Sequence, residues 1–448
     1  MRTTALSGAC AARMRVPGDR RVSSWRLRLL LPILLICPAW PLALQGCAGL
    51  AVAESTAMVD WQPPANIPMT IRTLNADGRF SQISTVAAAE RLRAEHPGEH
   101  LNILALSGGG AYGAFGAGAV AGLTRSGSRP DFAVVTGVSV GALIAPYAFL
   151  GPTWDADLLD VFSGAPGEQH LLQSRGLAAI FGSSLYSGKP LQHLVDTHLD
   201  DKMIQAIARE AKKGRLLLVA TTDVVTGIPV VWDLGAIAQN GGPNARTLLR
   251  DVLVASASVP GMFPPVMIRV NKDGVPHDEA HVDGDTTMPF FVPPAFMQTP
   301  PEARDGTSRH TTVYVIIDGP LGDPPKTTRL TTRAILSRSI NAGLNQMLLT
   351  TLELTAATAQ QQGATLQYSA VPITHPRGDP YDFRADMMMP LSRYALECAQ
   401  AGRLWTPFVH TDDSSGTSRS LTGAQEVPCP ADDASIRYFA SRDNGSPH

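Results

Sequence analysis

The sequence has little of what marks several common classes of protein. Of its 448 residues, 17% are charged, 6% are aromatic and five are cysteines. No group of His, Cys, Asp and Glu has the spacing of a metal site, no basic stretch is interleaved with aromatic residues, and no segment repeats. These absences argue against a metalloenzyme and a nucleic-acid-binding protein, and we expect no cofactor.

The formal charge of −2 hides an asymmetry along the chain. Residues 1–46 hold seven arginines and one acid, so the remainder carries a net charge of −8. A surface of that sign repels phosphate backbones, which is a second argument against nucleic acid as a partner.

The N-terminus has the pattern of an export signal. Its arginines lead into residues 29–44, an apolar stretch that contains three prolines. This stretch is short and broken for a membrane-spanning helix, which needs about 20 residues, but it fits the apolar region of a signal peptide. We expect residues 1–46 to be a signal peptide; a proline-broken membrane anchor is the alternative.

Two processing sites compete after the apolar stretch. Leu44-Gln45-Gly46-Cys47 resembles a bacterial lipobox, although a small residue is usual where Gln45 stands. Lipidation of Cys47 would anchor the protein in the outer membrane or periplasm of a Gram-negative-type envelope. Cleavage after Ala53 would instead release a soluble, secreted chain.

Cys398 and Cys429 are the two cysteines certain to remain free for pairing in the mature chain. Export leads to an oxidising compartment. We therefore expect a disulfide that staples the C-terminal segment and contributes about 3 kcal/mol on the chain-entropy model. Two unpaired thiols are the alternative.

The hydrophobic pattern predicts an α/β fold with a mainly parallel central sheet flanked by helices. Apolar strands alternate with helical segments between residues 101 and 294. We expect a tether and a short helix (85–95) over residues 47–100, a catalytic domain over 101–296, and a helical C-terminal part over 297–448. Further expected elements are a hairpin (216–222 and 228–233), an Asn-capped helix (244–257), a strand (312–317), an edge strand (368–373) and two helices (332–362 and 387–400).

A serine stands on the pattern of a nucleophile elbow. Gly137-Val138-Ser139-Val140-Gly141 follows the apolar strand 132–136 and precedes a helical run. Gly137 and Gly141 lack the side chains that would collide at so sharp a turn. Because G-x-S-x-G arises by chance in a glycine-rich chain, the motif needs support from its context.

A second glycine motif supplies that support. Gly108-Gly109-Gly110 and Gly113 follow the strand 101–106, and their backbone N–H groups would lie beside Ser139. The same residues match G-x-G-x-x-G, but a dinucleotide site needs an acid at the end of the next strand, and Asp131 precedes that strand. No Gly-Lys-Ser/Thr follows, so we expect no nucleotide. The small residues 113–122 predict a helix packed closely against the sheet and the elbow.

Four ordered motifs over residues 101–296 resemble patatin-like phospholipases: GGGAYGAFGAG, GVSVGA, ASASVPGMFPPV and HVDG. The resemblance implies a patatin-like three-layer fold and a Ser–Asp dyad. Carried over, Ser139 is the nucleophile and Asp283, before Gly284, is the general base. The amides of Gly109 and Gly110 form the oxyanion hole, and Gly108 shapes its turn.

Two residues depart from the family pattern. Tyr112 stands where Arg or Lys is frequent, and Asp285 stands where Gly or Ala is usual. A carboxylate so near Asp283 could raise its pKa, although we expect Asp285 to point away from the dyad. A non-catalytic envelope lipoprotein that keeps the fold is therefore an alternative.

Other residues could serve as the base. Asp318 also ends a strand and precedes a glycine, and Asp223 and Asp233 lie near the predicted hairpin. A Ser-Asp-His esterase is a further alternative, because three histidines lie downstream in the usual chain order: His310, His375 and His410. The expected activity is hydrolysis of acyl esters, with phospholipid as the substrate and the membrane surface as the place of work.

Overall fold

The computed structural model describes eight stretches of the chain: 69–74, 80–96, 100–164, 183–272, 275–298, 310–322, 327–372 and 379–407. The expected signal peptide, Cys47, the cleavage site after Ala53, Cys429, His375 and His410 lie outside these stretches. All described residues belong to one unit, Ala53–His448.

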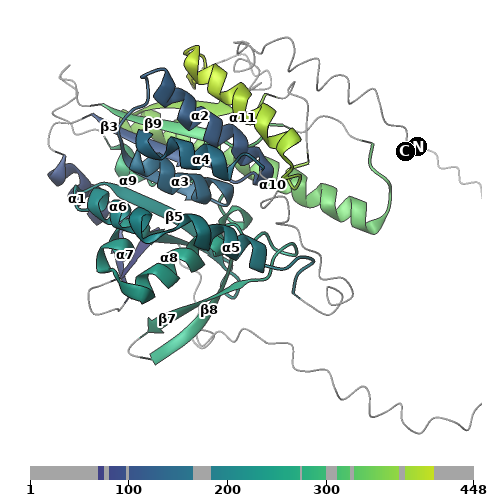
Figure 1. Ribbon diagram of the computed structural model, residues 1–448, viewed down its shortest axis with the longest axis horizontal. Coiled ribbons are helices and arrows are strands. Elements are labelled where there is room, and N and C mark those ends of the chain that lie inside the picture. Colours follow the sequence, from purple (N-terminus) through teal and green to yellow (C-terminus); the bar gives the residue numbers. More distant parts are fainter. Residues whose placement is uncertain are drawn as a thin grey trace, which may run out of the picture. The chain divides into compact units, whose positions relative to one another are not determined.

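A mostly parallel sheet forms the centre of the molecule (Figure 1). Its strands follow the order β11-β10-β9-β3-β4-β5-β6-β1-β2, and β8 pairs with both β5 and β7. The parallel centre consists of β10 (Thr365–Ala370), β9 (Thr311–Ile317), β3 (Leu101–Leu106), β4 (Phe132–Val138) and β5 (Leu216–Asp223). The remaining strands are β1 (Thr70–Leu74), β2 (Phe80–Ser84), β6 (Ile228–Asp233), β7 (Val266–Lys272), β8 (Val275–Asp283) and β11 (Thr406–Pro407).

Helices cover both faces of the sheet, and this confirms the predicted three-layer α/β fold. The central strands are apolar runs with almost every residue buried, as expected for a sheet sandwiched between helices. One face packs on α1 (Thr85–Glu95), α9 (Pro294–Met297) and α10 (Thr332–Gln362). The other packs on α2 (Gly113–Arg125), α3 (Val140–Leu150), α4 (Asp155–Val161), α5 (Lys189–His198), α6 (Asp201–Ala211), α7 (Leu234–Asn240), α8 (Gly242–Ser256) and α11 (Ala385–Gln400).

Three details differ from the sequence expectations. The segment expected as a tether over 47–100 contributes β1 and β2 to the sheet, through parallel pairing of β1 with β6. Helix α8 begins at Gly242, and its N-cap residue is Gly241, which has no side chain to cap it, so the expected Asn cap is wrong. Strand β10 is not at the edge, because the two-residue β11 pairs with it.

Some of the small residues of α2 pack against α11 and not, as expected, against the sheet and the elbow. A Cβ atom added to Gly122 would approach the carbonyl oxygen of Leu396 on α11 within 2.5 Å, and one on Gly118 would overlap the backbone of Ser392. Close packing of α2 on α11 therefore explains why glycine stands at these two positions. The glycines nearer the start, Gly113 and Gly116, do face Val140 and Asp318 as a helix beside the elbow should.

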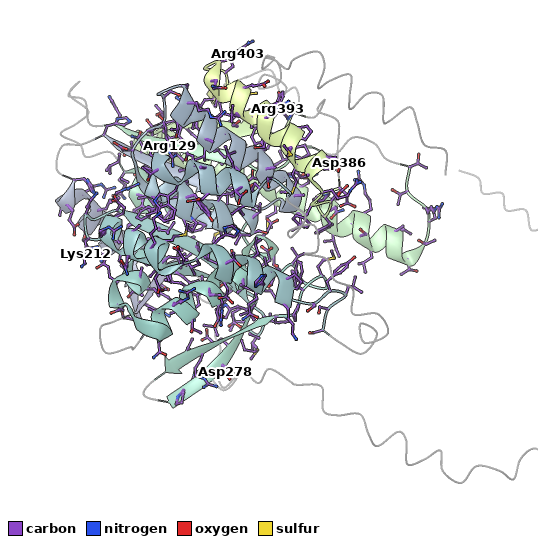
Figure 2. The ribbon with its side chains drawn as sticks, in the orientation of Figure 1. Arg129, Lys212, Asp278, Asp386, Arg393 and Arg403 are labelled. Carbon is purple, nitrogen blue, oxygen red and sulfur yellow. The ribbon has the colours of Figure 1, made fainter. Side chains whose placement is uncertain are left out.

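The side chain of Arg129 is buried and bonds to two neighbouring helices, whereas Lys212, Asp278 and Arg403 lie at the surface (Figure 2). The Arg129 guanidinium lies 2.6 Å from the Asp155 carboxylate at the start of α4 and donates to the carbonyl of Ala148 near the end of α3. These bonds hold the carboxyl end of α3, the helix that follows Ser139.

Candidate active site

Ser139 lies at the sharp turn between β4 and α3. Its φ of 54° is the one positive value among the described non-glycine residues, a strained conformation that is typical of a nucleophile elbow. The two neighbouring glycines make room for the turn: a Cβ on Gly137 would come within 2.6 Å of the Gly141 carbonyl, and one on Gly141 within 2.5 Å of the Leu106 carbonyl. The elbow expected from the sequence is therefore present.

The structure brings Ser139 and Asp283 together. The Ser139 hydroxyl donates to Oδ2 of Asp283 at 2.6 Å, and the two side chains are nearly fully buried. Asp283 reaches this place because β8 pairs with the end of β5, with Thr221 opposite Asp283, and β5 lies beside β4. The carboxylate is thus delivered by strand pairing from 144 residues further along the chain.

The Asp283 carboxylate is held from several directions. Its second oxygen, Oδ1, accepts from the backbone N–H of Asp285 at 2.8 Å. The backbone N–H of Asp283 donates to the Ser258 carbonyl at 2.9 Å, and the Thr222 hydroxyl donates to the Asp283 carbonyl at 3.0 Å. With both the side chain and the main chain fixed, Oδ2 stays aimed at the serine.

Burial raises the pKa of Asp283 well above its ordinary value, and the nearby charge of Asp285 raises it further. Hydrogen bonds from Ser139 and from the Asp285 N–H act in the opposite direction. Burial also raises the pKa of Asp285, to about 6. A carboxyl with a raised pKa is a better proton acceptor once ionised, which suits a general base.

The expectation that Asp285 points away is wrong. Its carboxyl lies against the glycine loop, because a Cβ on Gly108 would be 2.8 Å from Cγ of Asp285. The turn after Asp283 is a short 3-10 helix, Gly284–Thr286, and the charge of Asp285 in this turn acts on Asp283. A Cβ on Gly284 would come within 2.5 Å of the Ala220 carbonyl, so the turn has no room for a side chain at this position.

The glycine loop presents unpaired amides beside the elbow. Gly108 N–H donates to the Pro289 carbonyl at 3.1 Å, and Ala111 N–H donates to that of Pro380 at 2.7 Å. Between them, the N–H groups of Gly109 and Gly110 have no acceptor in the described part of the chain. These are the two amides that the resemblance assigned to an oxyanion hole, and they are free to bind a developing negative charge.

Two further groups were missed by the sequence reasoning. The Val140 N–H, at the first position of α3, also lacks an acceptor among the described residues, as the first amides of a helix do. The buried Ser256 accepts from Ser139 N–H at 3.0 Å and donates to the Ala220 carbonyl at 2.7 Å. Ser256 therefore braces the elbow, and the motif ASASVPGMFPPV contained it without indicating that contact.

The rival acids have other partners. Asp223 accepts from Val225 and Thr226 in the hairpin turn, and Asp233 caps α7 through the Ala236 N–H. Asp318 is fully buried and accepts from Gly116 N–H at 2.8 Å. None of these three carboxylates contacts Ser139.

Histidine plays no part in the hydrogen bonds of Ser139 and Asp283 within the described residues. His310, the described member of the three candidates, is exposed before β9. The buried His281 lies two residues before Asp283, but its ring nitrogens bond to Thr221 and Glu279. The geometry around Ser139 is that of a serine and a carboxylate.

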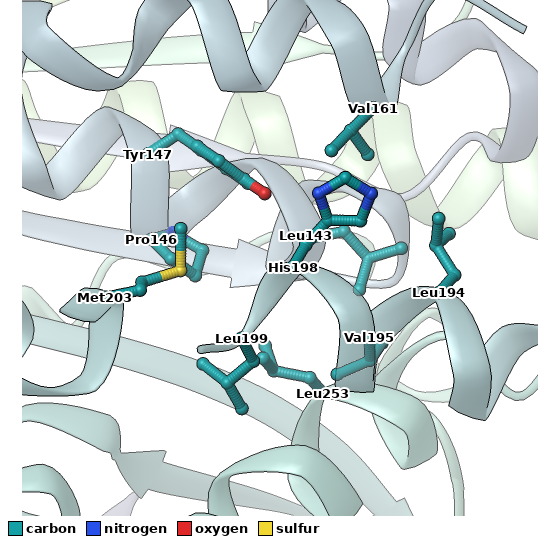
Figure 3. Close-up of a pocket in the computed structure, with 10 residues that line it drawn as sticks. All are labelled: Leu143, Pro146, Tyr147, Val161, Leu194, Val195, His198, Leu199, Met203 and Leu253. Carbon is teal, nitrogen blue, oxygen red and sulfur yellow. The ribbon is translucent and has the colours of Figure 1, made fainter. Parts of the chain in front are cut away.

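An apolar pocket lies along α3, the helix that Ser139 begins (Figure 3). Its cavity volume is about 30 Å³. Leu143 and Tyr147 line it from one and two turns after Ser139, and His198 projects among the aliphatic side chains. Burial lowers the pKa of His198, which keeps the pocket uncharged near neutral pH.

The remaining sequence expectations concern a disulfide, a metal site and a membrane-spanning helix. Cys398 on α11 is buried and disulfide-bonded, while its expected partner, Cys429, lies outside the described residues, so that pairing stays a prediction. In the part of the chain that the structure describes, no group of His, Cys, Asp and Glu is arranged to hold a metal ion, and no helix is long and apolar enough to cross a membrane.

Comparison with known proteins places this geometry in context. Residues 104–296 match the family model of patatin-like phospholipases. No curated protein matches the chain. Among solved structures, the chain is similar to the crystal structure of VipD from Legionella pneumophila, with 12% identity over 78% of this chain and 73% of that one and a TM-score of 0.30.

Proposed function

From the premise that residues 104–296 form a patatin-like phospholipase domain, we propose that the protein hydrolyses acyl esters of phospholipids with Ser139 as nucleophile and Asp283 as general base. The observation that carries this proposal is the 2.6 Å hydrogen bond between the two side chains. It lies at a strained elbow, next to glycine amides that have no acceptor among the described residues.

The reaction follows from the positions of these groups. Ser139 Oγ attacks the ester carbonyl carbon while Asp283 takes the hydroxyl proton. The carbonyl oxygen becomes an oxyanion that the N–H groups of Gly109 and Gly110 bind, with Val140 N–H as a third candidate donor. Asp283 then passes the proton to the departing alcohol, and a water molecule, activated by the same carboxylate, releases the fatty acid from Ser139.

The family match supports a lipid as the acyl donor. The surroundings of the nucleophile agree with an apolar substrate, because the pocket along α3 is lined almost wholly by apolar side chains and Leu143 lines it one helical turn after Ser139. A phospholipase A or lysophospholipase activity is the form of acyl-ester hydrolysis that we propose.

The site of action is part of the proposal. The export pattern of residues 1–46 and the lipobox at Cys47 support a hydrolase held at the periplasmic or outer face of an envelope. Replacing Cys47 with Ser should then prevent incorporation of labelled palmitate and release the chain from membranes. Absence of incorporation into the wild-type protein would favour the cleavage site after Ala53.

The activity is tested with phospholipids that carry different chains at the two acyl positions. We expect the wild-type protein to release fatty acid, and the chain released identifies the position. Ser139→Ala should release none, whereas Ser128→Ala, on an exposed turn, is the matched control and should retain full activity. Equal release by the wild type and Ser139→Ala would contradict the proposal, and no release by either would favour a non-catalytic envelope protein with this fold.

A further inference from the structure

Helix α10 is longer than its place in the fold requires. It connects the carboxyl end of β9 to the amino end of β10, strands of seven and six residues. A helix of 31 residues spans about 46 Å, roughly twice the length of such strands. Its second half therefore suffices to cover the sheet, and the first half extends beyond it (Figure 1).

Burial along α10 divides the helix in the same way. Leu352, Ala356 and Ala359 are buried against the sheet, whereas almost every described position of 332–343 is exposed. The helix begins with the Thr331 hydroxyl accepting from Ala334 N–H and ends at Gly363 in the left-handed conformation. Its first half is thus a defined helix with its own cap, although it has few packing partners among the described residues.

The exposed half carries an apolar stripe. Leu336 and Ile340, one turn apart, are 59% and 54% exposed, and Leu330 just before the helix is 90% exposed. Leu354 continues the line five full turns after Leu336 and is 67% exposed. The buried Leu352 lies about 160° around the helix from Leu336 at 100° per residue, so the stripe is not a continuation of the core.

The charges of this segment have one sign. Residues 327–352 contain Arg329, Arg333 and Arg338 and no aspartate or glutamate, in a chain whose net charge beyond residue 46 is −8. The helix is too polar to span a membrane, and it carries leucine and isoleucine beside arginine. This composition is typical of helices that lie at an anionic lipid surface.

The stripe lies at the edge of the sheet where the candidate active site lies. Strands β3, β4 and β9 are parallel, so Ser139 after β4 and the loop that leads from β9 to α10 leave the sheet at the same edge. Val224 and Val225, in the turn after β5, add exposed apolar side chains to that edge. A surface that met this edge would lie next to the elbow that holds Ser139.

We propose that the first half of α10, residues 332–349 with Leu330, docks flat on an anionic phospholipid bilayer and brings the active-site edge to its substrate. The proposal rests on the proposed function for what happens after docking; the contact itself depends on the apolar stripe and the arginines. Leu336 and Ile340 insert among the acyl chains, and Arg329 pairs with lipid phosphates.

Hydrogen exchange of the full chain localises the contact, even if the N-terminal segment also binds membranes. The Ser139→Ala protein keeps the vesicles intact during the measurement. Amides of 332–349 should exchange several-fold more slowly when vesicles of phosphatidylglycerol and phosphatidylcholine are added, because a docked helix opens less often. Exchange in α1 should not change. Unaltered exchange in 332–349, or equal slowing by phosphatidylcholine alone, would overturn the proposal.

Variants connect the contact to turnover. The double variant Leu336→Ser and Ile340→Ser should lower the ratio of vesicle turnover to turnover of dissolved p-nitrophenyl butyrate by about tenfold, since two apolar anchors are lost. Arg329→Gln should lower that ratio by about fivefold. Val86→Ser on α1, where Val86 is 54% exposed like Ile340, is the matched control and should leave it unchanged. A wild-type ratio in the double variant would overturn the docking.

The two proposals fail in different ways. Slower exchange in 332–349 without hydrolysis of any ester would leave docking in place and reject the proposed function. Hydrolysis of vesicle lipids with unaltered exchange would do the reverse.

Discussion

The dipeptide Asp-Gly occurs at the ends of two strands of this sheet, and the two aspartates have different roles. β8 ends at Asp283, which Gly284 follows, and β9 is followed by Asp318-Gly319. Both carboxyls are buried, and burial raises the pKa of both well above the ordinary value. Asp283 accepts a hydrogen bond from the Ser139 hydroxyl. Asp318 accepts one from the Gly116 N–H through Oδ1, and its Oδ2 has no partner in the described structure.

The difference lies in strand order. β9 lies beyond β3, with the glycine loop between its end and the elbow, whereas β8 pairs with β5 beside β4. Asp318 instead packs its main chain against Gly109, and its N–H donates to Ser107 Oγ at 2.9 Å. One aspartate thus faces the nucleophile, and the other supports the loop that would bind the oxyanion.

Exchanging each carboxylate for an amide should separate the two roles most strongly. Asp283→Asn removes the proton acceptor of Ser139, and we expect kcat/KM on a phospholipid to fall by about 10⁴. Asp318→Asn should stay within about tenfold of the wild type, because Asp318 does not contact Ser139 and an amide oxygen can still accept the hydrogen bond from Gly116 N–H. Circular dichroism of both variants serves as the folding control. A larger loss in Asp318→Asn would reverse the assignment.

The second effect tests the loop between the two aspartates. In Gly109→Ala the added methyl group would overlap the Asp318 carbonyl oxygen. The loop must then shift its free amides, and we expect kcat to fall by about 10²–10³. Gly319→Ala is the control, because a Cβ there meets nothing within 4 Å. Full activity of Gly109→Ala would exclude this amide from the oxyanion site.

The third effect concerns the pH dependence of activity and involves Asp283 but not Asp318. The base works when ionised, so activity is lost as the pH falls through the raised pKa of Asp283. Asp285→Asn removes the charge that raises this pKa, and the acidic limb of the kcat/KM profile should move to lower pH. Asp131→Asn, an exposed control at the opposite edge of the sheet, should not move it. A shift to higher pH in Asp285→Asn would contradict the coupling.

The smallest effect concerns stability and the second aspartate. Because the folded-state pKa of Asp318 is raised, the folded protein holds a proton that the unfolded chain releases. Stability from this group is therefore present below the unfolded pKa and is lost as the pH rises through the folded one. Asp318→Asn should lose less stability in urea between mildly acidic and mildly alkaline pH, by about 1.4 kcal/mol per unit of raised pKa. Equal slopes would show that Asp318 is not buried as described.

Local patterns predicted the parts of the molecule that depend on local physics. The elbow at Ser139 follows from glycines that a sharp turn requires, and α10 ends where Gly363 adopts a left-handed conformation. Strands β1 and β2 were missed because TIRTL and FSQIS are short and largely polar, and they become strands only by pairing with each other and with β6. The bracing role of Ser256 and the inward position of Asp285 depend on contacts across the fold, which no spacing in the chain encodes.

Labelling with a fluorophosphonate probe tests the central claim most directly, since it reports the reactivity of the serine without a lipid substrate. Mass spectrometry should find the probe on Ser139 in the wild type and in Asp318→Asn, and labelling should be lost or greatly slowed in Asp283→Asn. A probe attached to another residue, or labelling of Asp283→Asn at the wild-type rate, would contradict the account of a serine activated by that carboxylate.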